Sequence, residues 1–184
     1  MPPEVLAGRL SYDAYAQIPA DGRRWEFLDG EVHMTPAPSP AHQFTVVRLS
    51  HALDNCSAAF GAGHVVLVSP VDVILADDEI VQPDIVVARS GQLSARGIEG
   101  APPLIAEVVS PSRPALDRDV KARRYAAHGV QRYWIVDPLA RSLECYGLHA
   151  DGYVLQGHAE RTDVLTLGDL PGLAIDLARI WLPA

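Results

Sequence analysis

Cysteine, long hydrophobic runs and lysine are all scarce in this sequence, and the first two scarcities exclude classes of protein. The 184 residues include two cysteines, Cys56 and Cys145, and neither has metal-ligand spacing around it. Two reduced thiols are compatible with a cytoplasmic protein, and we expect both to be core or surface residues. The longest apolar stretches are far too short to cross a bilayer, and the first ten residues do not resemble a signal peptide. We therefore expect no membrane partner.

Several catalytic motifs are also missing. The sequence has no glycine-rich phosphate loop, no zinc-ligand spacing and no G-x-S-x-G elbow. Its net charge of −8 argues against a protein that passively coats nucleic acid, because such proteins present a basic surface. A nuclease is not excluded, since the distribution of charge matters more than its total. Residues 113–132 carry six positive and two negative side chains, although a solvated helix face would give the same pattern.

Lysine occurs once, as Lys121, beside fourteen arginines. The sequence thus uses guanidinium almost wherever it needs a positive charge. An ammonium differs from a guanidinium because it is a compact point charge whose pKa can change. Chance retention of a surface lysine would explain one lysine equally well, but its position in the positive segment makes it a candidate functional group.

The order of expected elements is typical of a mixed α/β protein, with one domain over residues 1–184. We expect an N-terminal helix and hairpin within residues 10–34, a core over about 40–148 and a C-terminal extension over 149–184. Helices are predicted at 10–18, 41–57 and 114–128. Strands are predicted at 64–68, 71–76, 80–88, 104–109, 132–138, 141–148 and 152–156.

The N-terminal hairpin has the clearest local signal. Asp29-Gly30 predicts a two-residue turn, which places Trp25 opposite Met34, Phe27 opposite Val32, Glu26 opposite His33 and Leu28 opposite Glu31. The first two pairs form an apolar face, so we expect this face to cover a core. The face with Glu26 and Glu31 is expected to show mainly polar groups.

Two acids stand inside apolar strands. Glu107 lies in LIAEVVSPS and Asp84 follows Pro83 in IVQPDIVVA. A buried carboxylate without a partner costs several kcal/mol or more, so Glu107 has a partner, lies at a wet strand end or binds a cation. Neighbouring strands would bring both acids together, and a divalent cation would relieve their repulsion. Pairing of each acid with an arginine, such as Arg118 or Arg124, is the structural alternative.

The helix at 114–128 starts a few residues after Glu107, so its first turns lie near the end of that strand. Asp117, Lys121, Tyr125 and His128 share one face of this helix. Lys121 could therefore reach a site made by Asp84 and Glu107, where it would stabilise a pentavalent phosphate or orient a water.

These motifs carry a resemblance to a known family. PD at 83–84, Glu107 and the following lysine resemble the PD-(D/E)XK nuclease superfamily. More narrowly, five ordered blocks resemble the Uma-two family of restriction-endonuclease-like proteins, from about Trp25 to the end: WEFLDGEVHMTPAPSPAHQ, QPDIVVA, LIAEVVSPS, DRDVKARRYAAHGVQRYWIVDP and LPGL.

The resemblance implies a restriction-endonuclease-like core, with a central mixed sheet flanked by helices, and a Mg²⁺- or Mn²⁺-dependent phosphodiesterase site. It implies that Asp84 and Glu107 are metal ligands, with the Val108 carbonyl a third, and that Lys121 is the catalytic lysine. The superfamily normally places its lysine two residues after the acid on the same strand, where this chain has Val109.

The resemblance also suggests secondary residues. His42 stands near the start of the first core helix, where the superfamily often has an auxiliary polar residue that holds a metal-bound water. Glu26 and Glu31 are weaker auxiliary candidates, and Arg118, Arg124 and Tyr125 are candidate substrate contacts.

Three functions compete at this point. The first is a metal-dependent endonuclease that hydrolyses DNA, as a homodimer because cutting two strands favours paired sites. The second is a catalytically inactive nucleic-acid-binding or regulatory module of the same fold. The third is a carboxylate-pair hydrolase such as a glycosidase, which would need aromatic sugar platforms that are sparse near these acids.

Overall fold

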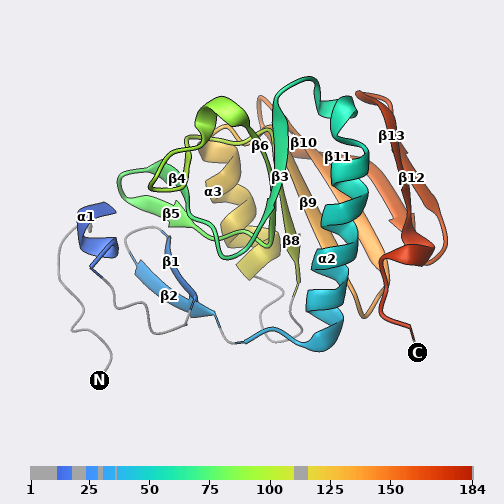
Figure 1. The fold of residues 1–184 in the computed structure, drawn as a ribbon, viewed down its shortest axis with the longest axis horizontal. Coiled ribbons are helices and arrows are strands. Elements are labelled where there is room, and N and C mark those ends of the chain that lie inside the picture. Colours follow the sequence, from blue (N-terminus) through green and yellow to red (C-terminus); the bar gives the residue numbers. More distant parts are fainter. Residues whose placement is uncertain (1–11, 18–23, 29–30, 36, 110–115, 184) are drawn as a thin grey trace.

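A six-stranded mixed sheet forms the centre of the molecule (Figure 1). The computed structural model describes residues 12–17, 24–28, 31–35, 37–109 and 116–183. The strand order is β11-β10-β9-β8-β6-β3, and only the β8–β9 pair among these neighbours is parallel. The strands are β3 (His64–Val68), β6 (Ile85–Arg89), β8 (Leu104–Val108), β9 (Arg132–Asp137), β10 (Ser142–His149) and β11 (Gly152–Glu160). The predicted mixed α/β fold is confirmed.

Both faces of this sheet are covered, which explains why its central strands are continuously apolar. Helix α2 (Pro40–Asn55) and the β12–β13 ribbon (Val164–Leu167 and Leu170–Asp176) lie over one face, and α3 (Ala122–Ala127) lies over the other (Figure 1). Side chains of β8 and β9 alternate between the two cores: Trp134 belongs to the first and Tyr133 to the second. Tyr133 is buried by this second covering layer.

A smaller five-stranded sheet, in the order β2-β1-β5-β4-β7, carries the N-terminal hairpin. Its strands are β1 (Arg24–Leu28), β2 (Glu31–Thr35), β4 (Val73–Ala76), β5 (Glu79–Val81) and β7 (Ile98–Glu99). The predicted hairpin register is confirmed at every pair. Phe27 packs with Ile74 and Ile80, and the short helix α1 (Tyr12–Tyr15) covers this cluster.

The single strand predicted over residues 80–88 is wrong, because the chain passes there from one sheet to the other. β5 belongs to the small sheet and β6 to the central one, with Gln82, Pro83 and Asp84 between them. Proline lacks the N–H that a continuous ladder needs, so a break at Pro83 is physically natural. The break leaves Asp84 at the entrance to the central sheet.

Helix α2 follows its prediction closely. Ser39 is its N-cap, and the Ser39 hydroxyl oxygen accepts a hydrogen bond from the His42 N–H at 3.2 Å. Pro40 occupies the first turn, where a missing N–H costs nothing. Val46, Leu49 and Leu53 recur at helical spacing and are buried on one face of the helix.

The helix expected over residues 114–128 is divided into two kinds of helix. A π-helical segment, η3 (Leu116–Lys121), precedes α3. Gly129 follows the helix with a φ of +82°, a left-handed conformation that glycine adopts readily at a helix end. A π-helical turn rotates the side chains away from α-helical spacing, and such turns are frequent at functional sites. Lys121 is the last residue of this segment. Short 3₁₀ helices at Ser57–Phe60, Ser90–Gln92 and Leu177–Arg179 complete the described elements.

None of the described helices has both the length and the apolar composition needed to cross a membrane.

The two cysteines should react very differently with thiol reagents. Cys145 is buried in the central sheet, and burial raises the pKa of its thiol, so the reactive thiolate is disfavoured. Cys56, at the end of α2, is only half-buried. We expect one thiol per chain to react with a chromogenic disulfide in the native protein and two in denaturant, and Cys56→Ser should remove the native reaction. A fast reaction that survives in Cys56→Ser would contradict this placement of Cys145.

Candidate active site

Asp84 and Glu107 lie next to each other at the end of the β6–β8 ladder. The last paired residues of that ladder are Ile85 and Ala106, so the two acids follow directly on neighbouring strands. The Val108 N–H donates to Asp84 Oδ2 at 2.9 Å, which brings the Asp84 carboxylate to the β8 strand beside Glu107. Both acids are buried, with 4% and 2% of their surfaces exposed. The structure therefore brings together the two acids that the sequence paired.

His42 reaches Asp84 from α2. Its Nε2 lies 3.1 Å from Asp84 Oδ2, and the side chain is almost fully buried in the first turn of the helix. The Ser39 cap fixes the backbone of this turn, so the position of the imidazole is set by the helix start. His42 Nδ1 is buried without a hydrogen-bond partner among the described residues. The predicted auxiliary residue thus contacts one of the two acids.

Lys121 enters from the opposite face of the sheet. Its Nζ lies 3.0 Å from Glu107 Oε1 and 3.1 Å from Glu26 Oε1, with 4% of the residue exposed. Tyr125, one turn further along, donates its hydroxyl to the same Glu107 oxygen at 2.7 Å. The shared helix face predicted for Lys121 and Tyr125 is therefore confirmed. Asp117 falls among residues whose side chains lie outside the described set.

Tyr125 remains a hydrogen-bond donor at any physiological pH. Burial, followed in effect by the Glu107 and Glu26 carboxylates, raises the pKa of its hydroxyl well above the ordinary value for tyrosine. The ring is fully buried and packs edge-on against Tyr133, with 5.2 Å between centroids. This placement favours a role inside the site over the substrate contact predicted for Tyr125.

Glu26 corrects the expected picture of the hairpin. Its face was predicted to show mainly polar groups, but Glu26 is 1% exposed and accepts hydrogen bonds from Lys121 Nζ and from the Gln82 N–H, both at 3.1 Å. The reason is that the Glu26 side chain lies against Gln82 and Lys121 instead of facing water. The side chains of Glu31 and Arg118 lie outside the described residues, so the structure does not place either candidate.

Arg124 has a partner outside the acid pair. Its guanidinium forms a fork with the fully buried Glu79 carboxylate, through Nε at 3.0 Å and through Nη2. Glu79 was not among the predicted site residues, although an acid beside the apolar pair Ile80 and Val81 carries the same signal that singled out Glu107. The ion pair attaches α3 to the small sheet.

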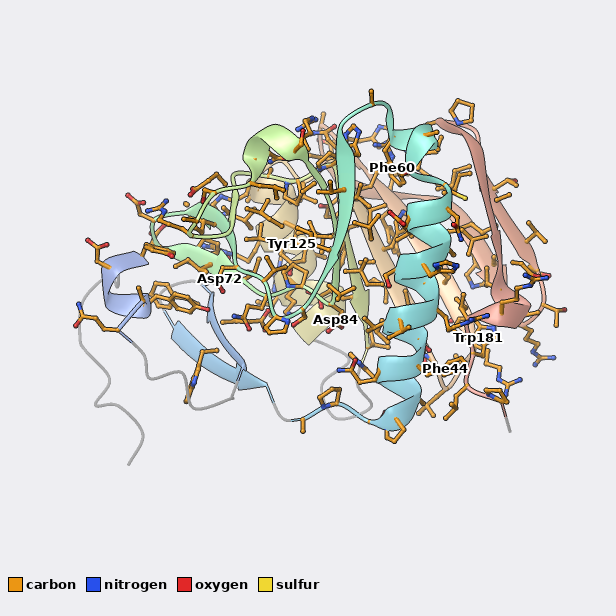
Figure 2. The ribbon with its side chains drawn as sticks, in the orientation of Figure 1. Phe44, Phe60, Asp72, Asp84, Tyr125 and Trp181 are labelled. Atoms are coloured by element: carbon orange, nitrogen blue, oxygen red, sulfur yellow. The ribbon has the colours of Figure 1, made fainter. Side chains whose placement is uncertain are left out.

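A second missed group surrounds Gln82. Its side-chain amide donates to Asp72 Oδ1 at 2.8 Å and to the Tyr15 hydroxyl at 3.2 Å, and Tyr15 in turn donates to Asp72 Oδ1 at 2.8 Å. In Figure 2 Asp72 lies between Asp84 and the end of the molecule that carries α1. The only sequence signal for Gln82 was its position two residues before Asp84.

The oxygen atoms of Asp84, Glu107 and Val108 suit a hard cation that needs few ligands from the protein. Within the described residues, no three His, Cys, Asp or Glu side chains converge as a metal cage. Mg²⁺ does not need such a cage, because it is usually held by one or two carboxylates together with waters and substrate phosphates. Asp84 and Glu107 supply two buried carboxylates. The Val108 carbonyl lies on the edge of β8 that faces Asp84, since the N–H and C=O of one strand residue point to the same neighbour. These residues fit Mg²⁺ or Mn²⁺.

Comparison with known proteins identifies the family and the fold of the chain. A protein from Anabaena variabilis ATCC 29413, whose solved structure is described as that of a "putative nuclease", superposes with a TM-score of 0.71 at 15% sequence identity. The match covers 93% of this chain and 97% of that one, and at this identity it establishes the fold alone. No curated protein matches the chain. Residues 12–178 match the family Uma2, described as "Putative restriction endonuclease", and the chain therefore belongs to the Uma2 family.

Proposed function

We propose that this protein is a metal-dependent endonuclease that hydrolyses DNA phosphodiester bonds. The observation that carries the proposal is the meeting of two buried carboxylates from neighbouring strands with the only ammonium side chain of the sequence. The nuclease-like fold and the family membership support a nuclease over a glycosidase that uses the same two acids.

In this proposal Asp84, Glu107 and the Val108 carbonyl hold Mg²⁺ or Mn²⁺. When bound, the cation would polarise the phosphate and make an activated water available near neutral pH. His42 fixes the orientation of the Asp84 carboxylate, because its Nε2 contacts the oxygen that also accepts from the Val108 N–H. Lys121 places a positive charge beside Glu107, where it would stabilise the charge that develops on the phosphate oxygens.

DNA is negatively charged and must reach a site on a protein that is itself negatively charged. The chain is acidic overall, so the substrate must approach through the locally positive segment 113–132. Arg123 in α3 is a solvent-facing cation of that segment, and Arg118 remains a candidate DNA contact. Cutting both strands of a duplex favours two sites, so we propose a homodimer as the active form.

The proposal predicts DNA nicking that depends on a divalent cation. Purified protein should convert supercoiled plasmid to nicked and linear forms in Mn²⁺ or Mg²⁺ and should not do so in EDTA. Lys121→Met should cut at least about 100-fold more slowly, because the charge that stabilises the transition state is removed. The measurement is the rate of loss of supercoiled plasmid on gels.

Two outcomes would contradict the proposal. Equal cleavage by Lys121→Met and wild type would show that the nuclease activity comes from another site or from a contaminant. DNA binding without cleavage in any divalent metal would support the inactive module of the same fold, which the apolar Val109 at the usual lysine position favours.

A further inference from the structure

The N-terminal hairpin contributes a carboxylate to the site from a distant part of the sequence. Glu26, on β1, lies 95 residues before Lys121, and its Oε1 accepts a hydrogen bond from the Lys121 ammonium. Both groups are almost fully buried. The ammonium is therefore held between Glu26 on one side and Glu107 on the other.

The same Glu26 oxygen connects the lysine to the segment that carries Asp84. Oε1 also accepts a hydrogen bond from the Gln82 N–H, and Gln82 stands two residues before Asp84. One carboxylate oxygen thus joins the helix that supplies the ammonium to the chain segment that supplies a proposed metal ligand.

Strand β1, which carries Glu26, is held in place by its pairing with β5. The neighbouring residue, Phe27, pairs with Ile80 of β5 and is buried with it in the small core beneath the hairpin. Gln82 is held from its other side by Asp72 and Tyr15. Because both ends of the Glu26 contact are fixed, the Lys121 ammonium has little freedom to move.

We propose that Glu26 is a positioning residue, which holds the Lys121 ammonium against Glu107 and at a fixed position relative to Asp84. A lysine has a long flexible stem and a compact charge, so a single contact would leave its ammonium in several places. A second carboxylate removes that freedom, and a misplacement of about 1 Å can cost about 100-fold in rate. The inference rests on the proposed nuclease function, and it implies that the site is complete only when the N-terminal hairpin is docked.

The single lysine allows a direct test. Protein grown with ¹⁵N-lysine should give one side-chain ammonium resonance, from Lys121, because the sequence has no other lysine. Glu26→Gln retains an oxygen that can accept from the Gln82 N–H, but it loses the charge facing the ammonium. We expect the Lys121 resonance to shift and to lose protection from water exchange in Glu26→Gln, and kcat for DNA cleavage to fall about 10- to 100-fold with little change in KM.

Two further variants separate positioning from simple charge neutralisation. Glu26→Asp keeps the negative charge but is one methylene shorter, so it should behave like Glu26→Gln if reach matters and like wild type if charge alone matters. Glu99→Gln removes an exposed acid that pairs with Arg96, and it should change neither the resonance nor the rate.

Each outcome decides the inference. An unchanged Lys121 resonance in Glu26→Gln would overturn it, as would a shifted resonance with an unchanged kcat or a Glu26→Asp variant that matches wild type. If the wild type fails to cut DNA, the proposed function fails, whereas the resonances still show whether Glu26 holds the ammonium.

Discussion

Asp84→Asn should lower metal-dependent DNA cleavage by about a thousandfold or more, equivalent to about 4 kcal/mol of transition-state stabilisation. The amide oxygen of asparagine can still accept from the Val108 N–H, so the local fold is retained. What is lost is one of two negative charges that would hold the cation, and a neutral amide is a much weaker ligand for Mg²⁺. The measurement is single-turnover cleavage in Mn²⁺ with enzyme in excess over DNA.

Thermal unfolding provides a check that does not depend on activity. A ligand that binds only the folded protein stabilises it, and at a given ligand concentration tighter binding stabilises it more. Mn²⁺ should therefore raise the Tm of the wild type and raise the Tm of Asp84→Asn much less. Asp151→Asn changes an exposed acid in the β10–β11 turn and should behave as wild type in both measurements. Wild-type cleavage by Asp84→Asn would remove Asp84 from the proposed site.

Arg124→Met should destabilise the protein by about 3 kcal/mol, because it leaves the fully buried Glu79 carboxylate without the guanidinium that now binds it. For a chain of this length that loss corresponds to a decrease in Tm of about 6–12 °C. Glu79→Gln should cost less, since the Arg124 side chain is 28% exposed and can be hydrated. The measurement is urea unfolding followed by circular dichroism.

A paired variant tests whether the loss comes from the buried charge. Arg124→Met combined with Glu79→Leu should recover most of the stability, since a hydrophobic pair can replace a buried ion pair at little cost. The experiment also separates two roles for Arg124. If Arg124 binds DNA, as the sequence suggested, Arg124→Met should raise KM for DNA and leave the Tm almost unchanged.

The sequence was most informative where local chemistry is sufficient. The Asp29-Gly30 sequence predicts the hairpin register that the flanking strands show, because a two-residue loop permits only one pairing of those strands. Ser39 and Pro40 likewise determine the start of α2, because the Ser39 hydroxyl caps the first turn and Pro40 needs no N–H there. The pairing of Asp84 with Glu107 also followed from sequence, since two acids inside apolar strands need a shared explanation.

Sequence patterns failed where the answer depended on which surface packs against which. The hydrophobic pattern of residues 80–88 is the same for one strand as for two strands in different sheets, so only the packed structure shows the passage at Pro83. The hairpin face with Glu26 looked solvent-exposed, because alternation identifies two faces but not what covers each of them.

The sequence by itself determined the fold class, the acid pair and the single ammonium, because these depend on residue types and on the order of the expected helices and strands. Only the tertiary structure decided that His42 contacts Asp84, that Glu26 shares the Lys121 ammonium with Glu107, and that Arg124 is bound to Glu79. Each of these contacts joins elements distant in sequence, and their partners are selected by how helices and sheets pack, which no local pattern encodes.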